Sequence, residues 1–104
     1  MYFVILGTDK PGHEQVRAAL RDLHRQYLGT APEHGVTLHH GGPTQSDDGQ
    51  RMNGMLLIVE AESIEVVEAF VREDPYSRDG LFAWVEIRPW TWTTGRPNTV
   101  TLQT

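Results

Sequence analysis

A histidine and an aspartate stand out in this chain as residues suited to moving protons. His24 falls inside an apolar repeat that is typical of a helix, and Asp74 opens the segment Asp74-Pro75-Tyr76, where one amphipathic run stops and another starts. An imidazole titrates near neutral pH, as general acid–base chemistry requires, and a neighbouring carboxylate can orient the ring or take the proton itself. If the fold brings the two together, they make a proton-transfer site.

Each residue also has a purely structural interpretation. An aspartate just before a proline at the first helical position is a typical N-cap. His24 lies four residues after Leu20 and four before Leu28, so it shares a helix face with them, and a histidine there needs a polar partner whatever its role. The sequence therefore leaves open a pairing of His24 with Asp74 that only holds the first helix to the second.

Asp9 and Tyr76 are further candidates for the same cavity. Asp9 follows the first apolar run and is a possible hydrogen-bonding or charge-tuning group, but a turn before Lys10-Pro11-Gly12 explains it equally well. Tyr76 is expected in the core or in a pocket wall, where its hydroxyl can donate to an oxyanion. Both are predicted substrate-binding residues.

The adjacent histidines His39 and His40 invite comparison with a metal site. Neighbouring strand residues point to opposite faces, so only one of them can join a given site. His40 shares its predicted face with Val36 and Leu38, which makes it the expected pocket-lining residue. The chain has no cysteine and no helical histidine pair at ligand spacing, and we expect neither a metal nor another cofactor.

Composition restricts the class of protein. A chain of 104 residues is expected to form one domain. Its formal charge of −5 argues against nucleic-acid binding, because such binding requires a basic surface. The apolar start, Met1 to Leu6, is too short for a signal-peptide core, and no other run approaches membrane-spanning length. We therefore expect a cytoplasmic protein without a membrane or nucleic-acid partner.

Six main elements are predicted to position these residues. The apolar patterns indicate strands over 1–7, 36–40, 55–59 and 82–87, and helices over 13–28 and from the Ser63 cap to Asp74. Gly41-Gly42-Pro43 is expected to end the second strand, and a short helical turn leads to Gly80. The order strand, helix, strand, strand, helix, strand predicts an α+β ferredoxin-like fold, with both helices on one face of an antiparallel sheet.

The other face of such a sheet needs a cover. Phe82 and Trp84 are predicted to lie on it, and a monomer would leave this apolar patch in water. We therefore expect a homodimer in which the sheets pack together. The threonine-rich tail over 91–104 has no clear pattern and is expected to extend the dimer or to fray.

Several short motifs give the chain a family likeness over residues 1–90. It resembles the YCII-related family of the dimeric α-β barrel superfamily, and the order of the motifs carries the resemblance. The matching pieces are Asp9, Leu23-His24, Gly41-Gly42-Pro43, Met55 to Glu60, Glu73-Asp74-Pro75-Tyr76, Gly80-Leu81-Phe82 and Val85 to Trp90.

The resemblance implies a function. In that family a histidine of the first helix and the aspartate of the Asp-Pro-Tyr motif are thought to form the active site, and here these positions are His24 and Asp74. The likeness extends to muconolactone isomerases and to a dehydrochlorinase of chlorinated hydroxyquinols. It implies a cofactor-independent lyase or isomerase of aromatic degradation, with dehydrochlorination to a hydroxyquinone as the first choice. Muconolactone-type isomerisation and a non-catalytic dimeric binding module are the alternatives.

Overall fold

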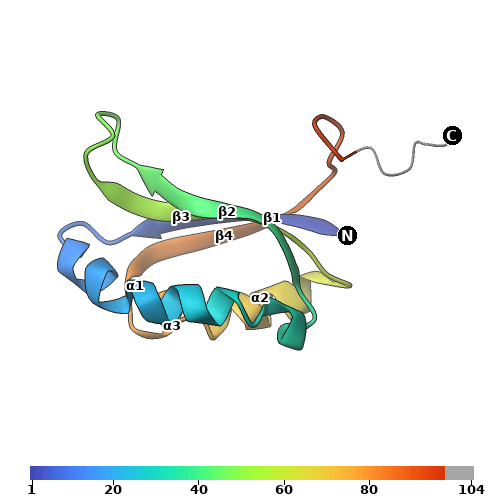
Figure 1. Ribbon diagram of the computed structural model, residues 1–104, viewed down its shortest axis with the longest axis horizontal. Coiled ribbons are helices and arrows are strands. Elements are labelled where there is room, and N and C mark those ends of the chain that lie inside the picture. The colour runs from blue at the N-terminus through green and yellow to red at the C-terminus, as the bar shows by residue number, and fades with distance from the viewer. Residues whose placement is uncertain (98–104) are drawn as a thin grey trace, which may run out of the picture.

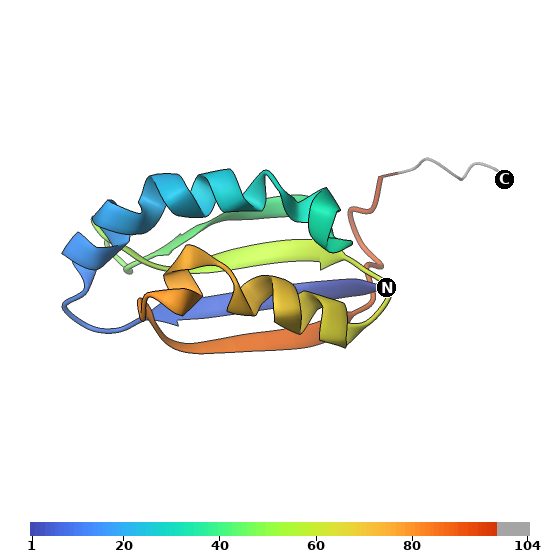
Figure 2. The same cartoon turned by 90° about the horizontal axis from the view of Figure 1, so that it is seen from below.

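The computed structural model describes residues 1–97, in which three helices cover one face of a four-stranded antiparallel sheet (Figure 1). The strand order is β2-β3-β1-β4, which confirms the predicted ferredoxin-like α+β fold. Figure 2, seen from the helix side, shows α1 lying beside α2 and α3 in front of the sheet. The elements are β1 (Tyr2–Asp9), α1 (Glu14–Leu28), the 3₁₀ turn η1 (Ala31–His34), β2 (Thr37–Gln45), β3 (Met52–Glu60), α2 (Ile64–Arg72), α3 (Pro75–Arg78) and β4 (Phe82–Trp90).

The core fills the space between the helices and the inner face of the sheet. Alternate residues of the central strands point inward, so Phe3 and Ile5 of β1 are completely buried. Val67 and Phe70 of α2 pack against them. No helix within residues 1–97 is long and apolar enough to cross a membrane.

The second strand is longer than predicted. It continues through Gly41-Gly42-Pro43 to Gln45, so the expectation that these residues end the strand was wrong. β2 lies at an edge of the sheet, and a proline in an edge strand can turn its missing N–H side away from the ladder without loss of a hydrogen bond. Packing explains why residue 41 is a glycine, because a Cβ there would lie 2.6 Å from a Leu57 methyl carbon.

An irregularity in β2 reverses the predicted direction of His40. Leu38 pairs with the buried Val59, but His40 pairs with Ile58, so the register shifts at His39. Directly paired residues share a face of the sheet, and an extra residue in one strand moves everything after it to the other face. Leu38 thus faces the helices, whereas His40 faces the outer side.

A second irregularity, in the pairing of β1 with β4, turns the Phe82 side chain to the opposite face from the one predicted. The register of β1 and β4 shifts so that Thr8 pairs with Trp84 and Asp9 with Phe82. Trp84 lies on the outer face, as predicted, with 63% of its surface exposed. Phe82 instead points inward, where its ring meets Tyr76 edge-on with centroids 5.8 Å apart. The prediction that both aromatic rings lie on the uncovered face was therefore wrong for Phe82.

The first residues of the C-terminal tail pack across the end of the outer face. Trp92 is buried and its ring contacts Tyr2 of β1 and His39 and His40 of β2. Its indole N–H donates to the Thr94 carbonyl at 3.0 Å. The tail predicted over 91–104 thus begins as a packed segment, and its part over 98–104 lies outside the described residues.

Candidate active site

A buried histidine–aspartate pair joins α1 to the start of α3. His24 Nδ1 lies 2.8 Å and 2.9 Å from the two carboxylate oxygens of Asp74. The two residues expose only 7% and 3% of their surface. Asp74 also caps α3, because its Oδ1 accepts a hydrogen bond from the Tyr76 backbone N–H at 2.9 Å. The cap and the pairing with His24 are therefore both present, made by one carboxylate.

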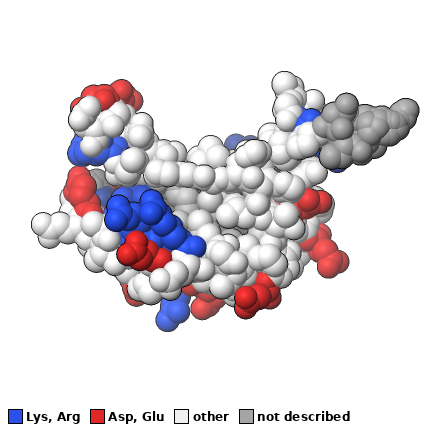
Figure 3. Space-filling view, viewed as in Figure 1, with Lys and Arg blue, Asp and Glu red and all other residues white. Residues whose placement is uncertain are grey.

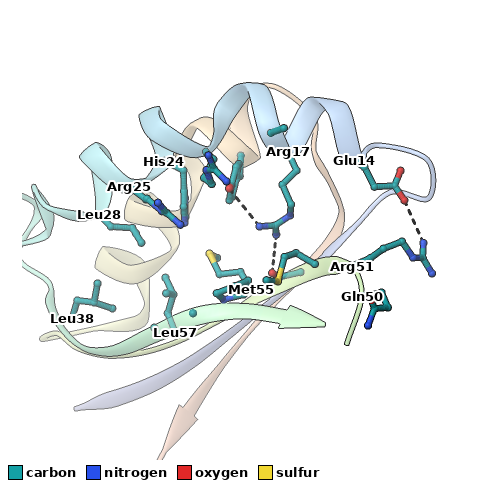
Figure 4. Close-up of a pocket in the computed structure, with 18 residues that line it drawn as sticks. Glu14, Arg17, His24, Arg25, Leu28, Leu38, Gln50, Arg51, Met55 and Leu57 are labelled. Carbon is teal, nitrogen blue, oxygen red and sulfur yellow. Dashed lines mark hydrogen bonds and ion pairs between the residues drawn. The ribbon is translucent and has the colours of Figure 1, made fainter. Parts of the chain in front are cut away.

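This geometry determines which nitrogen of His24 is free. An ionised carboxylate only accepts hydrogen bonds, so Nδ1 of His24 must carry the proton that Asp74 binds. The opposite nitrogen, Nε2, is then left for a ligand, and His24 lines a cavity beside α1 (Figure 4). A histidine held this way is arranged to take a proton at Nε2 while the carboxylate stabilises the resulting charge.

Tyr76 packs flat against the histidine. The two rings are nearly parallel, at 14°, with centroids 3.9 Å apart, and Tyr76 is 1% exposed. Burial raises the pKa of the Tyr76 hydroxyl, an effect that the nearby Arg17 guanidinium partly opposes. The tyrosine therefore stays a neutral phenol at physiological pH, able to donate a hydrogen bond at the edge of the cavity where His24 lies.

Arg17 links the tyrosine to Asp9. Its Nε and Nη2 donate to the two Asp9 oxygens at 2.7 Å and 3.2 Å, and Nη2 also donates to the Gly54 carbonyl at 2.7 Å. Its Nη1 lies 3.5 Å from the Tyr76 hydroxyl, and the guanidinium carbon is 4.9 Å from the centre of the Tyr76 ring. Arg17 lines the cavity. Asp9 does not line the cavity, and its carboxylate holds the Arg17 guanidinium in place.

The cavity itself is about 590 Å³ and lies between α1 and the β2–β3 pair. Gly41 and Gly42 contribute only backbone to the β2 side, and the Leu57 side chain packs against Gly41. The remaining wall is largely apolar, and Figure 4 shows Met55, Leu57 and Leu28 around the space that His24 and Arg17 border. A site with an apolar wall and a few convergent polar groups suits a small organic ligand.

The predicted site residues thus divide into three groups. His24 and Tyr76 line the cavity, while Asp74 and Asp9 stand behind it. His40 does not line it, contrary to our expectation, since the register shift at His39 turns it towards Trp92, with ring centroids 5.5 Å apart. No group of three or more histidine, aspartate or glutamate residues is placed to hold a metal within the described part of the chain.

Arg17 is the residue that sequence reasoning missed. Its position seven residues before His24 places both on one side of α1, and this spacing was the available signal. Its importance depends on three partners that come from β1, β3 and α3, and such convergence is not visible in the order of residues.

Comparisons with known proteins bear on the family and the fold of this chain. The YCII-related domain model matches residues 1–91. Protein YciI of Escherichia coli O6:H1 is 29% identical over 93 residues, which are 86% of this chain and 95% of that protein. The solved structure of the 5-chloro-2-hydroxyhydroquinone dehydrochlorinase TftG from Burkholderia phenoliruptrix AC1100, in complex with 2,5-dihydroxybenzoquinone, is 36% identical, with a TM-score of 0.78. The match covers 89% of this chain and 96% of TftG. Atu4242 from Agrobacterium tumefaciens shares the fold, at 16% identity and a TM-score of 0.57, over 92% of this chain and 96% of its own.

Proposed function

Because the chain belongs to the YCII-related family, we propose that it is a small cofactor-independent enzyme that moves a proton on a cyclic, oxygenated substrate. His24 is the proposed base and Asp74 its orienting partner. The observation that carries this proposal is the buried contact of 2.8 Å between them, made by a histidine that lines the cavity. A structural pairing alone would not require the histidine to border a cavity.

The preferred reaction is loss of hydrogen chloride from a chlorinated hydroxyquinol. In this proposal His24 Nε2 removes a phenolic proton, and the ring becomes a ketone as a proton is added to the carbon that bears chlorine. Chloride then leaves with the bonding electron pair while a second hydroxyl loses its proton, so a hydroxyquinone remains. The atoms balance as one substrate giving one hydroxyquinone, one proton and one chloride. The likeness to TftG supports this choice.

Tyr76 and Arg17 have supporting roles in this proposal. The neutral phenol of Tyr76 would donate to an oxygen of the substrate that becomes negative when His24 takes the proton. Arg17 is held by Asp9 and the Gly54 carbonyl, and it would keep the tyrosine hydroxyl in place. Isomerisation of a muconolactone-type substrate would use the same base, which removes a proton from one carbon and returns it to another.

A homodimer is part of the proposal. The outer face of the sheet carries Val4, Leu6, Leu56, Ile58 and Trp84, and no described element of the chain covers the exposed Trp84. Packing this face against a second copy would remove the patch from water. The dimer would also support a small domain, whose single core is of limited size.

Turnover tests the proposal directly. Pure protein would be incubated anaerobically with chlorinated hydroxyquinols and with muconolactones, following chloride release and absorbance. We expect turnover by the wild type and a loss of about a hundredfold or more for His24→Ala. Asp74→Asn should also be slow, since asparagine can keep the helix cap but cannot stabilise a charged imidazole. Turnover that survives in His24→Ala would exclude His24 as the base. A panel that is silent with folded wild type would favour the binding-module alternative.

A further inference from the structure

Positive charge gathers at the cavity although the protein as a whole is acidic. The chain has nine lysine and arginine residues and a formal charge of −5. Among residues 1–97, four arginines and a single acidic residue, Glu14, line this cavity. The arginines are Arg17, Arg21, Arg25 and Arg51. Figure 3 shows basic side chains on the face where α1 approaches the β2–β3 loop.

The four guanidinium groups differ in how far they are already neutralised. Arg17 is paired with Asp9 through two contacts. Arg51 meets Glu14 at 3.3 Å, and hydrogen bonds from the Glu14 backbone and from Arg51 lower the pKa of that glutamate, which keeps it ionised. Arg21 has only a loose contact of 3.9 Å with an exposed aspartate, Asp22.

Arg25 is the least compensated of the four. Within residues 1–97 no carboxylate lies at ion-pair distance from its side chain. The described part of the chain therefore gives Arg25 no carboxylate partner, and gives Arg21 only the loose contact with Asp22. A guanidinium binds a carboxylate in a planar, two-pronged arrangement, which is why arginine is common where such anions are recognised.

The spacing along α1 connects these arginines to the proposed base. Arg17, Arg21 and Arg25 follow one another every four residues and so lie on one side of the helix. His24 precedes Arg25 by one residue and follows Arg21 by three. One helical turn rises about 5.4 Å, so a group one turn from His24 is within the span of a single substituted six-membered ring.

We propose that the substrate is a monocyclic carboxylate, held by Arg21 and Arg25 at the cavity mouth with its ring against Met55 and Leu57. This placement leaves the ring hydroxyl or acidic carbon beside His24 Nε2. The inference rests on the proposed function for the role of His24. It adds that a fixed negative charge selects the substrate, so in the preferred reaction the chlorinated hydroxyquinol would carry a carboxylate on its ring.

Binding of two matched probes tests this inference. Calorimetry would compare 2,5-dihydroxybenzoate with hydroquinone, which has the same ring and hydroxyl pattern without the carboxylate. We expect the carboxylate to bind about tenfold more tightly, as two partly exposed ion pairs would give. Arg21→Gln/Arg25→Gln should remove most of this preference, and higher salt should reduce it. Arg72→Gln, an exposed change on α2 away from the cavity, is the matched control and should leave it unchanged.

The outcomes separate this inference from the proposed function. A preference for the carboxylate that the double variant abolishes supports the anion site, even if no compound is turned over and the enzyme proposal fails. Equal binding of the two probes, no binding of either, or a preference that survives in the double variant would overturn the anion site. Turnover of neutral hydroxyquinols by a protein without this preference would support the enzyme proposal and overturn the anion site.

Discussion

The energetic coupling between His24 and Asp74 can be measured without knowledge of the substrate. Four proteins would be compared: the wild type, His24→Ala, Asp74→Ala and the double variant. The side chains of the pair are 9% and 4% exposed, so each single change leaves the remaining group buried without its partner. The double variant removes both groups, and part of the loss in the single variants should disappear.

The expected size of this coupling follows from the contacts. A hydrogen bond to a charged group contributes about 1.5–3 kcal/mol, and we therefore expect a coupling energy of about 2 kcal/mol. Asp74→Ala also removes the cap on the Tyr76 N–H, at a cost of about 1 kcal/mol. Asp74→Asn should retain that cap and so be about 1 kcal/mol more stable than Asp74→Ala.

Urea unfolding gives these free energies. All proteins must be compared at one concentration, because a dimer would make the apparent stability depend on it. The matched control is the cycle for Glu14 and Arg51, whose contact is 3.3 Å but whose side chains are 53% and 64% exposed. This exposed pair should couple by less than about 1 kcal/mol. A His24–Asp74 coupling no larger than that of the control would refute a persistent buried pair.

Three other predictions concern Asp9, Tyr27 and Trp84. Asp9→Ala leaves the nearly buried Arg17 guanidinium without its carboxylate partner. Urea unfolding should show a free energy of unfolding that is lower by about 3 kcal/mol. A loss below about 1 kcal/mol would show that Arg17 finds another partner. Burial raises the pKa of Tyr27 from 10.0 to about 12, and its hydroxyl donates to the Phe70 carbonyl at 2.6 Å. The folded state therefore keeps this proton longer than the unfolded chain, so stability should be full below pH 10.0 and fall as pH rises towards about 12. Tyr27→Phe should flatten this part of a pH series of urea curves, and an unchanged slope would exclude Tyr27 as its source. Trp84→Glu should give a folded monomer in sedimentation experiments, and a persistent dimer would place the interface elsewhere.

The fold could be predicted largely because its elements follow simple patterns. The three-to-four spacing of Val16, Leu20 and Tyr27 gave the first helix, and Ser63 marked the start of α2, where its hydroxyl accepts from the Val66 N–H at 3.4 Å. Such signals are local, since they depend on helix geometry and on the needs of a helix end. The family likeness, in turn, supplied the pairing of His24 with Asp74, which no local pattern contains.

The two errors of direction, at His40 and Phe82, have one physical cause. Strand alternation assigns faces only while the pairing is regular, and a single extra residue reverses every assignment beyond it. Nothing in the alternation around His39 or Ala83 marks the extra residue. The face on which each residue of β2 and β4 lies can therefore be assigned only when the pairing with the neighbouring strand is known. The role of Arg17 likewise becomes visible only when its partners from three elements are known.

The double role of Asp74 has a consequence for local opening of the chain. The first N–H groups of α3 bind this residue: the Tyr76 N–H donates to its side chain, and the Ser77 and Arg78 N–H groups donate to its carbonyl. Any fluctuation that frees the start of this four-residue helix also releases the imidazole of His24. A ligand that engages His24 should therefore slow amide hydrogen exchange at Tyr76, although this amide itself need not touch the ligand. Hydrogen exchange at the start of α3 would then report whether the cavity is occupied.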